Sequence, residues 1–211
     1  TENETKNPGK VKLIAVTKTR DFQTINKAYE CGVTSIGENR VQEAESKFES
    51  FQNMPDLEKR FVGHLQSNKV KRCLALFDTI DSVHSLKIAK KINNHLTQEN
   101  RKIKSLLEVN MSGDEQKQGF SPENIDDLIL TISLEPLGVE GLMTIGPGSR
   151  NEKETRKAFS DLRKLKEKLN KEIKKESLRE LSMGMSGDFK IGIQEGGTMV
   201  RVGTALFGKR N

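Results

Sequence analysis

Residues 12–20, KLIAVTKTR, join an apolar run to a charged end. Leu13-Ile14-Ala15-Val16 has the composition of a buried strand, and Lys18 follows it after a single threonine. Many strands end in a charged residue, so a lysine at this position indicates no function by itself. The interpretation of Lys18 therefore depends on the fold to which the strand belongs.

Runs of the same character recur at regular intervals along the chain. They cover residues 12–18, 34–38, 60–65, 78–83, 104–110, 137–146, 180–185 and 199–208. Segments with helical periodicity or helix start signals lie between them, and these cover residues 22–31, 40–51, 67–76, 86–96, a stretch from Ser121-Pro122 to 132, 153–176 and 188–195. Eight strands that alternate with helices predict a parallel α/β architecture.

Two parallel architectures are compatible with this alternation, an open doubly wound sheet and a closed (β/α)8 barrel. The closed barrel, of the TIM type, fits the count of eight better and leaves no edge strand. No shift in composition marks a domain boundary, so we expect one barrel domain over residues 11–211. The polar segment 1–10, TENETKNPGK, is expected to be flexible.

The composition is typical of a water-soluble protein. Charged residues make up 31% of the chain, and no apolar run approaches the roughly 20 residues of a membrane-spanning helix. A net charge of +6 is compatible with nucleic-acid binding, but much of the basic excess lies in residues 153–176, where acids are interleaved with bases on an amphipathic helix. We therefore expect neither a membrane nor a nucleic acid as a partner.

The cysteines and histidines show no spacing typical of metal ligands. Cys31 and Cys73 are far apart and form no CxxC motif, and the three histidines lie in separate segments. We therefore expect no metal. Both cysteines are expected to be buried thiols in a reduced cytosol, which predicts a cytoplasmic protein.

Polar side chains stand at the carboxyl ends of the predicted strands. In a (β/α)8 barrel these ends form the face at which active sites lie. They carry Lys18 after the first strand, Asn39 after the second, His64 after the third and Met143 near the end of the sixth. We expect these residues to surround one site.

The last two strand ends lead into glycine-containing loops. Ser186-Gly187-Asp188 opens a short helix, and Gly203-Thr204 precedes a terminal helical turn. Helix N-termini and glycine backbones suit phosphate groups, and barrels often bind phosphate in these two loops. A partly desolvated amine near other cations attacks aldehydes, and an aldehyde with a phosphate tail is pyridoxal 5′-phosphate (PLP). A phosphosugar enzyme that uses no PLP is an alternative.

Several longer motifs, in the same order along the chain, resemble one protein family. They are AVTKTR, GENRVQEAESK, GHLQSNKV, LLEVNMSGDEQKQGF, GLMTIGP, LSMGMSGDF and VRVGTALFG. From residue 11 onward the chain resembles the pyridoxal-phosphate homeostasis proteins. These in turn resemble the barrel domain of alanine racemase, which has PLP fold type III, without its C-terminal β domain. The chain departs from the family pattern before Lys12, where members usually carry a helix.

The resemblance implies a binding mode for PLP. The cofactor is expected as a Schiff base on Lys18. Its phosphate is expected to contact the hydroxyl of Ser186 and the region of Gly203 and Thr204.

The resemblance also implies residues around the ring. Arg201 is expected near the pyridine nitrogen, and Asn39, Met143 and His64 are expected beside the cofactor. A cation next to that nitrogen opposes its protonation, which makes the ring a poorer electron sink. The alternative for Arg201 is a structural salt bridge.

Two functions compete. The resemblance implies a carrier that buffers PLP or delivers it to apo PLP enzymes and affects the balance of amino and keto acids. An amino-acid racemase, in contrast, needs two bases on opposite faces of the substrate carbon, and alanine racemase takes the second from a tyrosine of its partner subunit. The single tyrosine here, Tyr29, is expected to pack on the exterior of the barrel, although His64 is open as another base. We favour the carrier, as a monomer and without established catalytic residues.

Overall fold

The computed structural model describes residues 11–49, 51, 54–114, 116–149 and 151–209. The polar segment 1–10, which was expected to be flexible, lies outside these residues. Within the described part of the chain, eight parallel strands form a closed barrel in the order of the sequence. The strands are β1 (Lys12–Val16), β2 (Ser35–Glu38), β3 (Glu58–Phe61), β4 (Thr79–Val83), β5 (Ile103–Glu108), β6 (Leu137–Met143), β7 (Glu180–Met185) and β8 (Met199–Val202).

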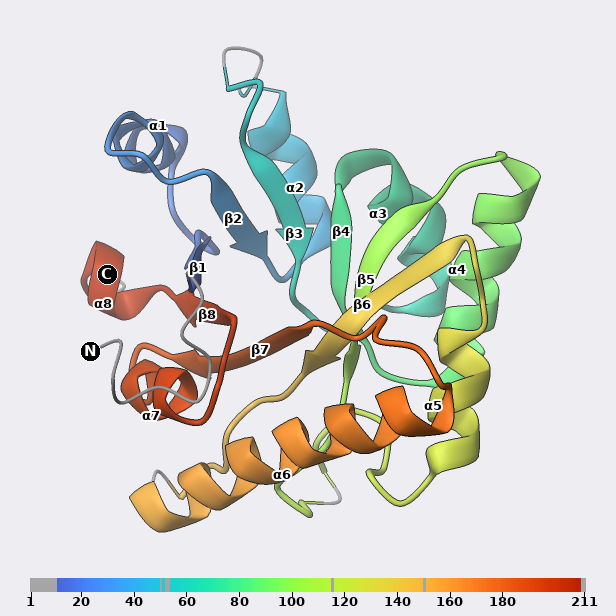
Figure 1. Cartoon of the computed structure of the whole chain (residues 1–211). Coiled ribbons are helices and arrows are strands. Elements are labelled where there is room, and N and C mark those ends of the chain that lie inside the picture. The colour runs from blue at the N-terminus through green and yellow to red at the C-terminus, as the bar shows by residue number, and fades with distance from the viewer. Residues whose placement is uncertain (1–10, 50, 52–53, 115, 150, 210–211) are drawn as a thin grey trace.

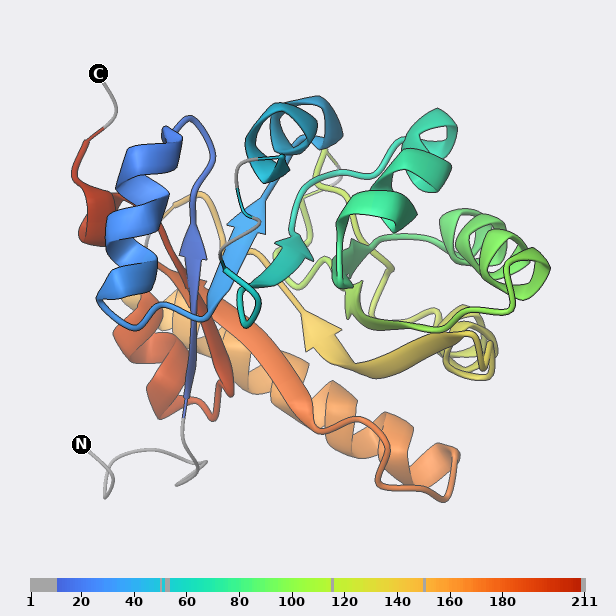
Figure 2. The same cartoon turned by 90° about the horizontal axis from the view of Figure 1, so that it is seen from above.

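Helices cover the outside of the barrel (Figures 1 and 2). They are α1 (Phe22–Glu30), α2 (Val41–Phe48), the 3-10 helix η2 (Ser67–Lys69), α3 (Val70–Leu76), α4 (Leu86–Gln98), α5 (Ile125–Ile132), α6 (Glu152–Glu172), α7 (Phe189–Gln194) and α8 (Thr204–Phe207). Each of the longer ones has one apolar face. On α4, for example, Ile88, Ala89, Ile92 and Leu96 are buried at helical spacing against the sheet.

Pairing between the first and the last strand closes the barrel. Leu13 lies opposite Val200, and Ile14 lies opposite Arg201, in parallel register. This pairing confirms the predicted (β/α)8 barrel and excludes the open sheet. It also places β8, late in the chain, side by side with β1 at its start, as Figure 1 shows.

Two different kinds of side chain fill the inside of the barrel. Ile14, Leu106, Met143 and Met199 form a small apolar cluster. Nearer the amino ends of the strands, charged side chains form a network of ion pairs. Arg60 bonds both Asp81 (2.8 Å) and Glu58 (3.0 Å), and Glu58 also bonds Lys12 (3.1 Å). Lys12 and Glu58 belong to strands separated by β2, so the network links β1, β3 and β4.

Several predicted boundaries are wrong for local reasons. The run 199–208 is not one strand, because β8 ends at Val202 and residues 204–207 form α8. The start signal Ser121-Pro122 does not open α5: the hydroxyl of Ser121 bonds Glu123, and the cap is Asn124, whose side chain accepts from the N–H of Asp127.

The two cysteines differ from each other. Cys73 is buried, as expected, but Cys31, which follows the last turn of α1, is exposed. Both are free thiols. In the described part of the chain, no helix has the length and apolar character needed to cross a membrane.

Candidate functional site

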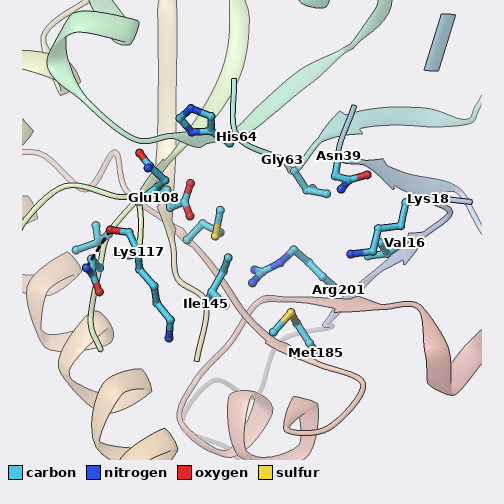
Figure 3. Close-up of a pocket in the computed structure, with 15 residues that line it drawn as sticks. Val16, Lys18, Asn39, Gly63, His64, Glu108, Lys117, Ile145, Met185 and Arg201 are labelled. Atoms are coloured by element: carbon cyan, nitrogen blue, oxygen red, sulfur yellow. Dashed lines mark hydrogen bonds between the residues drawn. The ribbon is translucent and has the colours of Figure 1, made fainter. Parts of the chain in front are cut away.

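A cavity of ≈ 350 Å³ opens at the carboxyl ends of the strands. Figure 3 shows side chains from opposite sides of the barrel converging on it, among them Lys18, His64, Glu108 and Arg201. The lining residues are Val16, Lys18, Asn39, Val62, Gly63, His64, Glu108, Val109, Asn110, Lys117, Gln118, Met143, Ile145, Met185 and Arg201. The size is that of a small-molecule site, and apolar walls with a few cations suit an anionic ligand with an apolar body.

Lys18 lies where the sequence predicted it, directly after β1 and half-buried at the cavity. The chain turns there, because the N–H of Arg20 donates to the carbonyl oxygen of Thr17 at 2.9 Å. Thr17 itself is fully buried, and its N–H donates to the carbonyl oxygen of Gly37 on β2 at 3.1 Å. The turn therefore starts from a fixed strand end and directs the lysine into the cavity.

Arg201 projects from β8 into the same cavity and is buried. Its Nη1 donates to the carbonyl oxygen and the hydroxyl of Ser182, and its Nη2 donates to the carbonyl oxygen of Thr144, all at 2.8 Å. These are hydrogen bonds to neutral groups, and no salt bridge of Arg201 occurs among the described residues. Burial lowers the pKa of the guanidinium, whereas Asp81 and Glu108 act in the opposite direction.

Asn39 and His64 reach the cavity through a close contact between two loops. A Cβ on Gly63 would lie 2.2 Å from the carbonyl oxygen of Asn39, so only glycine allows the segments after β2 and β3 to approach in this way. The ring of His64 packs on that of His84, with 4.4 Å between the centroids. Burial and the neighbouring His64 lower the pKa of His84, and the carbonyl oxygen of Ser82 opposes this shift.

Met143 ends β6 and is buried beneath the cavity, which it lines together with Glu108. It belongs to the apolar cluster inside the barrel. Its thioether therefore forms part of an apolar floor.

Ser186, Gly203 and Thr204 form a separate group beside the cavity and do not line it. The hydroxyl oxygen of Ser186 accepts from the N–H of Gly203 at 3.2 Å and from the N–H of Ala205 at 3.1 Å. Because both bonds use lone pairs of that oxygen, its hydrogen is left to donate to a further group. The structure thus brings the two predicted phosphate loops together, next to the cavity residue Met185.

The sequence reading missed Glu108, the last residue of β5. Glu108 lines the cavity and is only 7% exposed, and its side chain has no hydrogen-bond partner among the described residues. Burial raises the pKa of Glu108 from 4.5 to about 7, although Arg201 opposes this shift. A single acid within the apolar run LLEV was the signal that could have identified it.

Lys117 was also missed, because it lies in an irregular loop with no periodic pattern. The loop returns to β5 at Phe120, whose N–H donates to the carbonyl oxygen of Glu108 at 2.8 Å. This return carries Lys117 to the cavity, where its amine donates to the carbonyl oxygen of Gly146 at 3.2 Å. No sequence signal distinguishes Lys117 from the other loop lysines.

Tyr29 lies on α1 and packs against the apolar cluster that includes Ile25 and Ile36. It does not line the cavity, in agreement with the predicted packing role. Among the described residues, no three histidine, cysteine or acidic side chains come together as metal ligands would.

The group that the sequence implies, PLP, fits the donors present. The cavity offers two amines and a guanidinium, and the adjacent Ser186 offers a hydroxyl hydrogen for a phosphate. Its apolar walls include Val16, Val62 and Ile145, which can pack on an aromatic ring.

The chain is similar over nearly all of its length to proteins of one family. The family model described as alanine racemase, N-terminal domain, matches residues 2–211. The pyridoxal phosphate homeostasis protein of Aquifex aeolicus is 42% identical over 200 residues, which cover 94% of this chain and 87% of that protein. The protein of the same name from Synechocystis sp. is 39% identical and covers 96% of this chain and 93% of its own length.

Solved structures show the same relationship. The structure of PipY from Synechococcus elongatus with PLP bound has a TM-score of 0.87 and 36% identity, and the match covers 94% of this chain and 92% of that one. The alanine racemase of Clostridium difficile has a TM-score of 0.75 at 20% identity, with 99% of this chain and 54% of that enzyme covered. The second likeness concerns the fold alone.

Proposed function

The chain belongs to the alanine racemase N-terminal domain family and, within it, to the pyridoxal phosphate homeostasis proteins. On this premise we propose that it binds PLP and serves in PLP homeostasis as a carrier that buffers the cofactor or delivers it to apo PLP enzymes. One observation carries this proposal. Lys18 and Arg201 extend from the adjacent strands β1 and β8 into one cavity with apolar walls. A PLP-bound relative of the same fold supports it.

Lys18 is the residue proposed to hold PLP as a Schiff base. An amine at a strand end in a concave site can condense with an aldehyde, and the carrier function requires that this bond can also be reversed. The phosphate is proposed to lie at Ser186, Gly203 and Thr204. Asn39, Met143 and His64 are proposed to surround the ring.

Arg201 is proposed to lie beside the pyridine nitrogen. A permanent cation there opposes protonation of the ring, so the bound cofactor would stabilise a substrate carbanion poorly. The position of Tyr29 outside the cavity also supports a carrier over a two-base racemase. The resulting prediction is that the purified protein does not racemise L-alanine.

We further propose that the protein acts as a monomer in the cytoplasm. Free thiols such as Cys31 and Cys73 persist in a reducing compartment, which supports the location. Sedimentation of the PLP-loaded protein tests the first point, and cell fractionation tests the second.

The experiment that tests the proposal is reduction of the PLP-loaded protein with borohydride, followed by peptide mapping. We expect a visible absorption band that borohydride removes, and a reduced adduct on Lys18. Lys18→Ala should lack the band, whereas Lys117→Ala, which removes the other cavity lysine, should keep it. An adduct on Lys117, or a band that survives in Lys18→Ala, would contradict the assignment.

A further inference from the structure

One helix holds the backbone on both sides of Lys18. From α2, the amine of Lys47 donates to the carbonyl oxygen of Thr17 at 2.9 Å, and a carboxylate oxygen of Glu43 accepts from the N–H of Thr19. Lys47 and Glu43 also bond each other at 2.6 Å, one helical turn apart. The residues before and after Lys18 are therefore fastened to a single ion pair.

Glu38, the last residue of β2, anchors this ion pair to the barrel. Its Oε1 accepts from the hydroxyl of Thr17 at 2.7 Å and from the amine of Lys47 at 2.9 Å. Glu38 is fully buried, and its Oε2 has no hydrogen-bond partner among the described residues. Burial raises the pKa of Glu38, against the hydrogen bonds from Lys47 and Thr17.

Such an arrangement is a poor way to stabilise a fold. Buried charges lose their hydration, and a well-packed apolar group of the same size often stabilises a protein as well or better. Instead, Lys47 and Glu43 bond two backbone groups of one turn, and Glu38 bonds the hydroxyl of Thr17 in the same turn. This convergence indicates a role in fixing the geometry of that turn.

The conformation of Thr19 points the same way. Its φ angle is 63°, in the left-handed region that β-branched residues rarely adopt. The N–H of this strained residue donates the hydrogen bond that Glu43 accepts. Without that acceptor, the turn that carries Lys18 would be free to relax toward ordinary backbone angles.

We propose that Glu43, Lys47 and Glu38 are positioning residues that hold the Lys18 turn in the conformation that directs its amine at the bound aldehyde. The inference rests on the proposed function for its consequence in PLP binding. A nucleophile that is already aligned reacts faster, because no further ordering is needed at the moment of attack. The lysine side chain is long and flexible, so fixing the backbone at Lys18 limits the positions that its amine can reach.

The first test measures amide exchange of Thr19 by NMR in the protein without PLP. Glu43→Ala should speed this exchange about tenfold, because a hydrogen bond to a charged acceptor is lost. Glu43→Gln keeps an oxygen that can accept and should fall close to the wild type. Asp161→Ala removes the partner of another i,i+4 ion pair, with Lys157 on α6, and should leave Thr19 unchanged.

The second test measures the rate at which the absorption band forms after PLP is mixed with the same four proteins. Glu43→Ala should slow it about tenfold, with Glu43→Gln close to the wild type and Asp161→Ala equal to it. The bond from Lys47 to the carbonyl oxygen of Thr17 is tested in the same way. The single variant Lys47→Met would leave the buried Glu38 without its cation and destabilise the fold, so the double variant Lys47→Met, Glu38→Gln is used. It should slow band formation by a similar factor.

The outcomes separate the two proposals. If Thr19 exchanges equally fast in the wild type and in Glu43→Ala, the positioning inference is wrong, whatever happens with PLP. If exchange accelerates but the band forms at the wild-type rate, the turn is held for stability alone and the inference is again wrong. If no protein forms a band, the proposed function fails, and the inferred role of Glu43 toward Lys18 fails with it.

Discussion

A single nitrogen of Arg201 donates to both the carbonyl oxygen and the hydroxyl of Ser182, each at 2.8 Å. The other terminal nitrogen donates to the carbonyl oxygen of Thr144, the residue after β6. The guanidinium is thus oriented by the barrel and needs no ligand to fix it. The positive charge of Arg201 therefore has a fixed position in the cavity before a ligand binds.

Replacing Arg201 by lysine should therefore destabilise the protein although the charge is kept. A lysine ammonium cannot reproduce the planar fork that reaches Ser182 and Thr144 at once. We expect the free energy of unfolding in urea to fall by about 1–3 kcal/mol. Ser182→Ala, which removes only the hydroxyl acceptor, should cost about 1 kcal/mol. Equal stability of Arg201→Lys and the wild type would show that the fork contributes nothing.

Glu108 should make the stability of the PLP-free protein depend on pH. Its pKa is raised by burial from 4.5 to about 7 in the folded state. The folded state therefore holds a proton that the unfolded chain releases, and this contribution is complete below pH 4.5 and is lost as the pH rises to 7. We expect a loss of about 3 kcal/mol over that range.

Glu108→Gln tests this dependence, because the amide resembles the protonated carboxyl and does not titrate. Relative to the wild type, the variant should gain stability between pH 4.5 and pH 7 and differ little below that range. Urea unfolding at several pH values measures the difference. The exposed Glu167→Gln serves as the control, and parallel curves for wild type and Glu108→Gln would contradict the assignment.

Ser186 should select for the phosphate of the ligand. Its oxygen already accepts from the N–H groups of Gly203 and Ala205, so its hydrogen can donate to a phosphate oxygen. Ser186→Ala should weaken PLP binding about tenfold or more, since a hydrogen bond to a charged group contributes about 1.5–3 kcal/mol. Binding of pyridoxal, which lacks the phosphate, should change far less. Equal losses for the two ligands in equilibrium titrations would place the phosphate elsewhere.

The two thiols should react at very different rates. Cys31 is exposed, whereas Cys73 is buried in the main apolar cluster, and burial raises the pKa of the Cys73 thiol. Ellman's reagent should label one thiol quickly in the native protein and the second only after unfolding. Cys31→Ser should remove the fast phase. Rapid labelling of two thiols in the native state would mean that the core around Cys73 opens readily.

The amino-acid sequence by itself determined the order of the elements and the position of Lys18. Apolar runs at steady spacing predicted the eight strands, and the helices expected from residues 22 and 86 begin there, capped by the side chains of Asp21 and Ser85. These features are local, because periodicity and capping involve residues only a few positions apart. The motifs also identified the family before any geometry was known. The sequence was less reliable at boundaries such as Ser121-Pro122, where a neighbouring Asn could cap equally well.

Only the tertiary structure decided which side chains meet. Arg201 is held by Ser182 and Thr144, and the turn of Lys18 is held by two side chains of α2. In the sequence, Arg201 is 19 positions from Ser182 and 57 from Thr144, and the bonds from α2 to the Lys18 turn span 24 and 30 positions. Local patterns specify which face of an element is buried, but closure of the barrel and its register specify what that face contacts. For that reason Glu108, an unremarked acid in an apolar strand, became a cavity residue only when the barrel closed around it.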